Sequence, residues 1–143
     1  NNVIEHVHKP IDLLRECYRV LKPTGRLIIT TPNVESLSAR IFGAYWRGLE
    51  PPRHVHIFTM DAIKSAVHAS GFDNISVRSI VRDGYITGSS YALAKNIPFQ
   101  NGNPELGIFK AYIAELVALI LSFIVLVKNN LGEELVLICG KGG

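Results

Sequence analysis

The stretch Val3-Ile-Glu-His-Val-His-Lys-Pro10, with Leu21-Lys-Pro-Thr-Gly25 and Leu27-Ile-Ile-Thr-Thr-Pro-Asn33 downstream of it, decides the fold predicted for this chain of 143 residues. Between the first two motifs apolar side chains recur at helical spacing, and Pro10 fixes φ at the helix start. Pro23 and Gly25 then stop the helix before a β-branched run begins. The predicted order is strand end, loop, helix, tight turn and strand, which is the second half of an α/β unit.

Further elements are predicted downstream from caps and periodicity. After a strand over residues 26–31, Ser36 is placed to cap a short amphipathic helix that runs to about Tyr45. Thr59 is placed to cap a second helix, and Gly71 to end it. Residues 72–81 alternate apolar and polar side chains, as a half-buried strand does, and residues 134–139 predict the last strand.

Residues 83–130 are interpreted as an insertion between the last two strands. Residues 83–107 are rich in turn-forming residues and predict a loop with a turn of helix near Ala92, whereas residues 108–127 are nearly all apolar and predict a helix. Two interpretations of that helix are open. It is buried against the sheet or in a dimer interface, which a return strand favours, or it contacts a membrane between Lys110 and Lys128. A transmembrane span is disfavoured because Glu115 in lipid would cost about 2.5 to 3.5 kcal/mol.

Composition narrows the class of protein. With 48% hydrophobic and 19% charged residues the chain is not of a disordered type. The net charge of +3 comes from dispersed side chains, which argues against nucleic acid as a partner. Cys17 and Cys139 are far apart and suit small buried hydrophobic positions in a reducing compartment. We therefore expect a cytoplasmic protein, at the inner face of the membrane if the apolar helix touches lipid.

Together the opening motifs resemble a segment of class I S-adenosylmethionine-dependent methyltransferases. That family leaves its fourth strand at "(L/I)EHV..P", passes "RVLKPGG" and enters its fifth strand at "TPN"; here Thr24 stands at the first glycine. The resemblance implies an α/β fold, the C-terminal half of a Rossmann-like sheet with an extra apolar helix before the last strand, and S-adenosylmethionine as cofactor. The family's glycine-rich turn and acidic ribose-binding residue are absent, so residues 1–143 are expected to be a single partial methyltransferase domain without the first strands.

The resemblance also implies where a site lies. Ligands of open α/β sheets lie beyond the carboxyl ends of the strands, which points to residues 1–8, 31–34 and the linker at 46–57. Asn2, Val3 and Glu5 are expected beside the cofactor. In the ubiquinone-biosynthesis O-methyltransferases the stretch looks like E-x-x-E-H, a carboxylate cluster suited to a divalent cation; here Asn2 replaces the first carboxylate, so no metal is assigned. His6 is a candidate base oriented by Glu5, or Glu5 caps the next helix and His6 makes a loop contact.

Pro51-Pro-Arg-His-Val-His-Ile-Phe58 is the second cluster, and it resembles the "P.H...F" segment that borders the acceptor pocket of sugar-modifying and quinone methyltransferases. His54 is therefore a candidate base or acceptor contact. In an extended segment His56 would point the same way, so both could reach the pocket, or both could bind a metal with His6 and His8. Asn33 and Trp46 are candidate acceptor contacts, and their structural alternatives are a turn and core packing.

The leading functional hypothesis is an S-adenosylmethionine-dependent methyltransferase that methylates oxygen on a small-molecule, glycan or lipid-linked acceptor, with the activity of the isolated chain left open. The alternative is a non-catalytic methyltransferase-like fragment that acts in oligomerisation, as a homodimer, or in membrane association. Metal-dependent hydrolysis by the histidine pairs is disfavoured, because hydrolytic sites normally add carboxylates at defined spacing.

Overall fold

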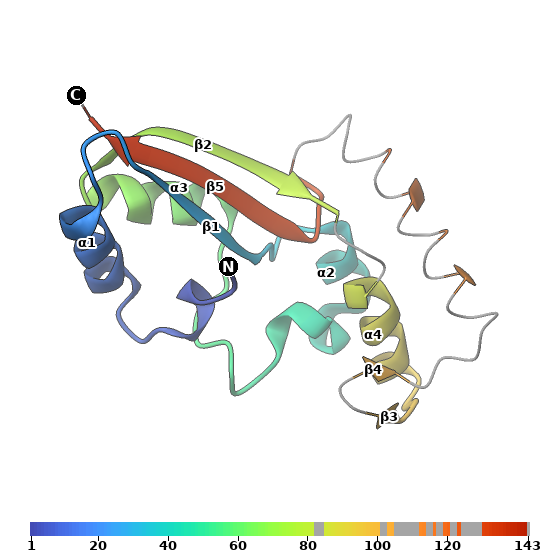
Figure 1. Cartoon of the computed structure of the whole chain (residues 1–143). Coiled ribbons are helices and arrows are strands. Elements are labelled where there is room, and N and C mark those ends of the chain that lie inside the picture. Colours follow the sequence, from blue (N-terminus) through green and yellow to red (C-terminus); the bar gives the residue numbers. More distant parts are fainter. Residues whose placement is uncertain are drawn as a thin grey trace.

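The computed structural model describes residues 1–81, 85–100, 103–104, 112–113, 116, 119–120, 123 and 130–142. Its centre is a three-stranded sheet in the order β1 (Arg26–Pro32), β5 (Glu134–Lys141), β2 (Phe72–Ile80), shown in Figure 1. Both pairings are antiparallel, with Ile29 opposite Leu137 and Val77 opposite the same residue. The last strand of the chain therefore lies between the two earlier ones and ties them together.

The opening residues differ from the predicted strand end. Ile4–His6 is a short 3-10 helix, η1, and the backbone of this segment is bonded to β1 where the Asn2 N–H donates to the Thr30 carbonyl at 2.9 Å. Asn2 has a φ of 52°, in the left-handed region and not in the extended region of a strand. Parallel pairing within the described residues is limited to an isolated bridge between Asn33 and Phe58.

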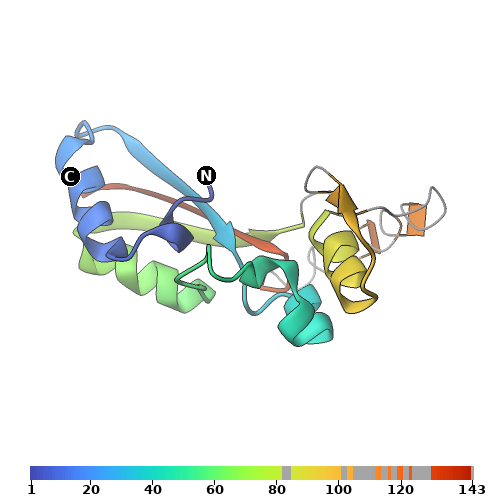
Figure 2. The same ribbon diagram turned by 90° about the horizontal axis from the view of Figure 1, so that it is seen from below.

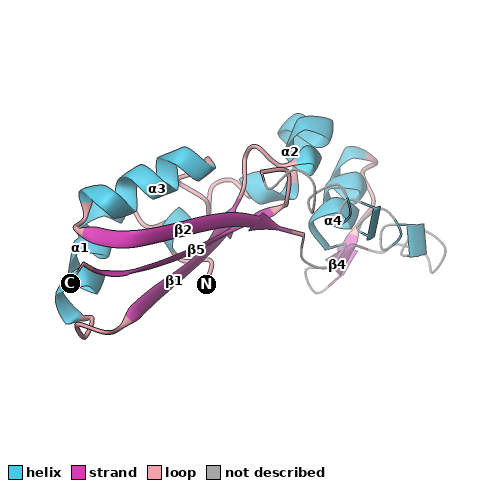
Figure 3. Ribbon diagram, turned by 90° about the horizontal axis from the view of Figure 1, so that it is seen from above, coloured by secondary structure: helices cyan, strands magenta, loops and turns pink. Residues whose placement is uncertain are grey.

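Two amphipathic helices cover one face of the sheet. They are α1 (Pro10–Val20) and α3 (Met60–Ala69), and they lie on the same side in Figures 2 and 3. Pro10 begins α1, the Thr59 hydroxyl caps α3 by accepting from Ala62 N–H at 3.0 Å, and Gly71 follows α3 with a φ of 95°. These three sequence-based expectations are confirmed.

The core forms between this face and the helices. Its buried members are Ile4, Leu14, Ile29, Phe58, Ile63, Val67, Phe72, Leu135, Leu137 and Cys139. The Phe72 ring meets Tyr18 of α1 edge to face, with centroids 5.1 Å apart. Burial raises the pKa of the Cys139 thiol to about 11, so the thiol stays protonated, and Cys17 and Cys139 are both free cysteines, as expected.

Beyond β1 the predicted helix to Tyr45 is shorter than expected. Ser36 caps α2 (Leu37–Phe42) as predicted, but the helix ends at Gly43, where φ is 52°. The chain continues as two 3-10 helices, η2 (Gly43–Tyr45) and η3 (Arg47–Leu49). Ile41 and Tyr45, two large apolar residues within the range predicted for the amphipathic helix, are 64% and 55% exposed.

Part of the predicted insertion is also helical where only a single turn was expected. α4 (Tyr85–Ala94) packs against α2 and η3, and the small residues Ser89, Ser90 and Ala92 are buried there. Tertiary contact thus overrides a composition typical of loops. A short hairpin of β3 (Phe99–Gln100) and β4 (Asn103–Pro104) follows.

The predicted apolar helix at 108–127 lies largely outside the described residues. The residues of that range that are described are helical and 46 to 73% exposed: Tyr112, Ile113, Leu116, Leu119, Ile120 and Phe123. Within the described parts of the chain, no helix combines the length and apolar character that crossing a bilayer requires.

Candidate functional site

Three segments meet at the carboxyl end of β1. The Glu5 carbonyl of η1 accepts from the N–H groups of Val55 and His56, at 2.8 and 3.1 Å, so the linker is held against the opening residues. The Glu5 side chain in turn reaches Thr31, which lies next to the end of β1. This is the convergence expected from the carboxyl-end rule, and it occurs although residues 1–8 form no strand.

Glu5 is the most deeply buried polar member of the cluster. Its side chain is 0% exposed, and its Oε2 accepts from the Thr31 hydroxyl at 3.2 Å. The other oxygen, Oε1, has no hydrogen-bond partner among the described residues. A buried carboxylate oxygen left in that condition costs about 1 to 3 kcal/mol or more, so the position favours a ligand that donates.

His6 presents one ring nitrogen to that carboxylate. Its Nδ1 lies 2.8 Å from the Arg53 carbonyl, and its Nε2 lies 4.0 Å from Glu5 Oε1. Because a carbonyl oxygen only accepts, Nδ1 carries the hydrogen of that bond, and the neutral ring leaves Nε2 as an acceptor.

His54 is arranged in the same manner. Its Nδ1 lies 2.7 Å from the Gly48 carbonyl, so Nε2 is again the free acceptor of the neutral ring. The two imidazoles stand 4.7 Å apart between centroids at 54°, and the His54 side chain is only 6% exposed. Gly48 is required here, because a Cβ would collide with the Trp46 indole.

Glu50 is a residue that the sequence reasoning missed. Its Oε1 accepts from Arg47 Nη2 at 2.9 Å and Arg53 Nη1 at 2.7 Å, and its Oε2 lies 3.6 Å from His54 Nε2. The sequence did contain a sign of this cluster. Glu50 lies three residues from each of two arginines and four residues from His54, and side chains at these spacings can meet in a turn as well as in a helix.

The other predicted site residues lie at the border of the cluster. The Asn33 amide is fully engaged by backbone: Nδ2 donates to the carbonyls of Asn130 and Gly132, and Oδ1 accepts from Glu35 N–H. This matches the turn role weighed for it. Trp46 is 2% exposed and packed, and His56 Nε2 lies 3.4 Å from the His8 carbonyl.

Metal-ligating atoms of Glu5, His6 and His54 all lie within 4.8 Å of one another. One carboxylate and two imidazoles are a donor set that divalent ions accept, so the geometry would allow a cation here. His8 and His56, which were considered as partners of such an ion, are not members of this group among the described residues.

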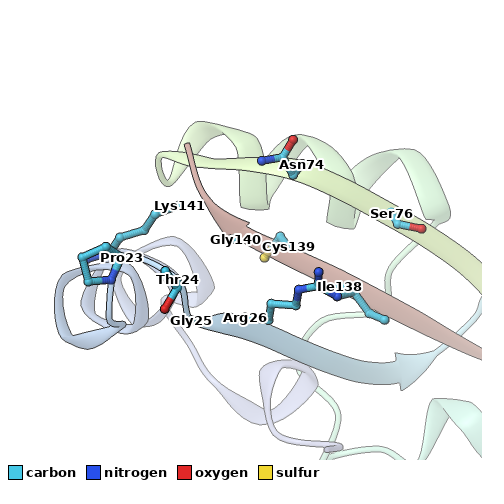
Figure 4. Close-up of a pocket in the computed structure, with 10 residues that line it drawn as sticks. All are labelled: Pro23, Thr24, Gly25, Arg26, Asn74, Ser76, Ile138, Cys139, Gly140 and Lys141. Atoms are coloured by element: carbon cyan, nitrogen blue, oxygen red, sulfur yellow. The ribbon is translucent and has the colours of Figure 1, made fainter. Parts of the chain in front are cut away.

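The structure has one cavity away from the cluster of Glu5, His6 and His54 and a second cavity next to the opening residues. One of about 490 Å³ (Figure 4) is lined by residues 23–26 at the start of β1, by Asn74 and Ser76, and by residues 138–141. It contains none of the predicted site residues. A second, of about 170 Å³, lies between the opening residues, α1 and β1, and Asn2 and Val3 line it.

Comparison with known proteins gives one family match and several partial relatives. A family model described as "Methyltransferase domain" matches residues 1–77. A malonyl-[acyl-carrier protein] O-methyltransferase of Marinomonas sp. is 34% identical over 68 residues, 47% of this chain and 24% of that protein. A ubiquinone biosynthesis O-methyltransferase of Cereibacter sphaeroides is 31% identical over 85 residues, 55% of this chain and 34% of that protein. The chain thus spans about a quarter to a third of the length of these curated relatives.

Solved structures agree in fold. A SAM-dependent methyltransferase from Archaeoglobus fulgidus superposes with a TM-score of 0.55 at 16% identity, covering 99% of this chain and 57% of that one. Phosphoethanolamine N-methyltransferase 2 from Haemonchus contortus, in complex with S-adenosyl-L-methionine, gives a TM-score of 0.51 at 16% identity, covering 99% and 32%. At such identities the likeness concerns the fold, and it confirms the predicted α/β class.

Proposed function

This chain belongs to the methyltransferase-domain family, and from that premise we propose that it forms the acceptor side of an S-adenosylmethionine-dependent methyltransferase site. The reaction proposed is methylation of oxygen on a small-molecule, glycan or lipid-linked acceptor. The observation that carries the proposal is the meeting of Glu5, His6 and His54, which come from two segments 47 residues or more apart in the chain.

The cofactor's fit to these residues can be tested on two features. Asn2 and Val3 line the cavity of about 170 Å³ and would form one wall of the cofactor site. Glu5 Oε1, which has no hydrogen-bond partner in the part of the chain that the structure describes, suits a ligand hydroxyl or ammonium, and S-adenosylmethionine carries both kinds of donor. When bound, the cofactor supplies a methyl group on a sulfonium centre. The glycine-rich turn of the family is absent from residues 1–143, so this chain supplies only part of that site.

The roles proposed for the side chains follow from their free atoms. An acceptor hydroxyl would donate to Nε2 of His54 or His6, which takes the proton as the oxygen gains the methyl group. Glu5 would orient that hydroxyl or the resulting imidazolium through Oε1. Asn33 and Trp46 would shape the border, the first by holding the turn after β1 and the second by supporting Gly48.

We propose oxygen as the atom that is methylated because the cluster of Glu5, His6 and His54 presents hydrogen-bond acceptor atoms to a substrate. Glu5 Oε1 and both Nε2 atoms accept hydrogen bonds, and a hydroxyl both donates to them and becomes nucleophilic when it loses its proton. The two curated relatives named above as O-methyltransferases support the same choice.

Contact with an apolar partner is a further part of the proposal. The exposed helical residues between Tyr112 and Phe123 support association with a second copy of the chain or with a membrane surface, and two free cysteines support a cytoplasmic location. Light scattering at several concentrations would detect the dimer, and sedimentation with anionic lipid vesicles would detect the membrane contact. A monomer that stays in the supernatant would exclude both.

Cofactor binding is the first experiment. S-adenosylhomocysteine at 100 times its Kd should stabilise the protein by about 2.7 kcal/mol, because a ligand that binds only the folded state shifts unfolding by mass action. A thermal-shift titration measures this, with adenine alone as the control ligand. Absence of any shift at millimolar S-adenosylhomocysteine would remove the basis for methyl transfer.

Transfer itself is tested with labelled S-adenosylmethionine and two probe acceptors, catechol and methyl glucoside, with aniline as the nitrogen counterpart. His54→Gln should lower transfer by about 10²- to 10⁴-fold if the imidazole is a general base. His68→Gln is the matched control, because His68 is an exposed histidine of α3. Equal activity of the two variants would reject His54 as the base.

A further inference from the structure

We propose that Glu50 is the positioning residue of the site, which fixes the orientation of both imidazoles through its carboxylate and its own backbone. An effect of Glu50 on catalysis rests on the proposed function. Its effect on the orientation of the two histidine rings does not, because it involves only residues of this chain. Glu50 would not touch the acceptor. It would act through His54, which it faces, and through Arg53, whose carbonyl holds His6.

The two carboxylate oxygens of Glu50 have different partners. Oε1 accepts from Arg47 Nη2 at 2.9 Å and from Arg53 Nη1 at 2.7 Å, which ties both ends of the turn to one atom. Oε2 lies 3.6 Å from His54 Nε2, within ion-pair range once that nitrogen carries a proton. The Glu50 side chain is 20% exposed and the Arg47 side chain 25%, so solvent screens that pair only in part, whereas the Arg53 side chain is 68% exposed and its pair with Glu50 is screened more strongly.

The backbone of Glu50 makes the same turn rigid from within. Its carbonyl accepts from the N–H groups of Arg53 and His54, at 2.9 and 3.3 Å. The residue has φ 32° and ψ 52°, a left-handed conformation that is unfavourable for a side chain with a Cβ. Strain of this kind persists only where surrounding contacts over-determine it, and here the side-chain contacts of Glu50 supply them.

The link to His6 runs through Arg53. Arg53 gives its carbonyl to His6 Nδ1 at 2.8 Å while its guanidinium is held by Glu50. Both imidazoles are thus oriented by carbonyls of one turn, Arg53 for His6 and Gly48 for His54, and Glu50 stands between the two. Removing its carboxylate should loosen both rings together, although His6 lies on a different segment.

The same contacts indicate what the two arginines near Glu50 do. Arg47 and Arg53 are both paired with Glu50. They serve the turn in this arrangement, and Glu50 Oε2 adds a second carboxylate oxygen beside His54.

The experiment compares Glu50→Ala and Glu50→Gln with Glu16→Gln, an exposed glutamate that is also paired with an arginine three residues away. Long-range ¹H–¹⁵N spectra of the imidazole rings report which nitrogen is protonated, without any need for turnover. In the unmodified protein both His6 and His54 should show protonated Nδ1 and bare Nε2. Glu50→Ala should shift or broaden the ring signals of both histidines, whereas Glu16→Gln should leave them in place.

Glu50→Gln separates position from charge. The amide oxygen still accepts from the arginines, so the ring signals of His6 should stay close to those of the unmodified protein, and the variant should fold even if Glu50→Ala does not. With probe acceptors, kcat should fall about 10- to 100-fold for Glu50→Ala, since small misplacements cost that much, with KM changed less than threefold and partial rescue in Glu50→Gln.

Unchanged ring signals of both histidines in Glu50→Ala and Glu50→Gln would overturn the proposal, as would equal losses in kcat and affinity across all three variants. The two claims fail separately. Ring signals that move as expected in a protein that transfers no methyl group would retain the positioning role and reject the proposed function.

Discussion

The sheet with α1 and α3 is held by different kinds of contact from those that hold the linker at residues 46–57. In the first region apolar side chains such as Phe72, Ile63 and Leu137 are buried to about 1% exposure or less, and packing holds them. In the linker the holding contacts are polar: carbonyls of Gly48 and Arg53 on two imidazoles, and one carboxylate on two arginines.

The difference teaches which substitutions each region tolerates. A packed core responds to lost volume, because cavities are costly, and is indifferent to charges placed elsewhere. A turn held by polar contacts responds to the loss of a single donor or acceptor and exposes free lone pairs toward a ligand. The first region decides where the site lies, and the second decides which atoms face it.

The largest effect should come from the core. Phe72→Ala should destabilise the protein by about 3 to 5 kcal/mol, because the buried ring and its edge contact with Tyr18 are lost and a cavity remains. Urea denaturation measures the change. Ile28→Ala is the control, since Ile28 is a strand residue that is 55% exposed, and should cost far less. Similar costs for the two would contradict the division into packed and exposed faces.

The second-largest effect is expected in the turn after β1, which connects the sheet to the segment that leads into the linker. Asn33→Ala should cost about 2 to 3 kcal/mol, because the carbonyls of Asn130 and Gly132 lose their donors at a fully buried position. The measurement is again the free energy of unfolding. Ser65→Ala, on the exposed side of α3, serves as the control. A cost below that of the control would mean that the turn after β1 does not need the amide.

The third substitution should raise the free energy of unfolding, in contrast to the first two, and it tests the difference between the packed core and the polar cluster most directly. Glu5→Gln should stabilise the protein by about 1 kcal/mol, because the amide NH2 can donate toward His6 Nε2, which lies 4.0 Å from Glu5 Oε1, while the amide oxygen still accepts from Thr31. Methyl transfer should fall at the same time. Glu16→Gln, at an exposed position, should give no such gain. Destabilisation by Glu5→Gln would show that the carboxylate is structural.

The smallest effect lies on the surface of α1. The hydrogen bond from Arg19 lowers the pKa of Glu16 below its usual value in the folded protein. A depressed carboxyl pKa stabilises the fold above the unfolded-state pKa, and the gain is lost as pH falls through the folded value. Glu16→Gln should therefore lower the free energy of unfolding slightly at neutral pH, and the difference from the unmodified protein should vanish as pH falls through the folded pKa of Glu16. A change at pH 7 as large as that of Asn33→Ala would be contrary to an exposed pair.

The sequence predicted the elements near its strongest local signals. Pro10, Ser36, Thr59 and Gly71 each act where they were expected, because caps and breakers work on backbone groups within a turn of their own position. α4 was underestimated, since its helix depends on packing small buried residues against α2 and η3, which no local pattern contains.

For the candidate site, sequence reasoning named two histidines that the structure brings together, His6 and His54, and it overlooked the contacts that hold them; their catalytic role stays a prediction. His6 and His54 were found through motifs, yet Glu50 carried no motif of its own, and its importance arises only when the turn closes on Arg47 and Arg53. Asn33 and Trp46 were named as contacts, and the fold gives their polar and aromatic groups to the backbone turn and to Gly48.

The sequence by itself determined the order of α1, β1, α2, α3, β2 and β5 and the family to which the chain belongs, because periodicity, caps and motifs are properties of neighbouring residues. Only the tertiary structure decided that β5 lies between β1 and β2, and that polar atoms of Glu5 and His54 lie within 4.8 Å of each other. Those outcomes join residues 47 or more positions apart, and such contacts are fixed by the packing of the whole chain.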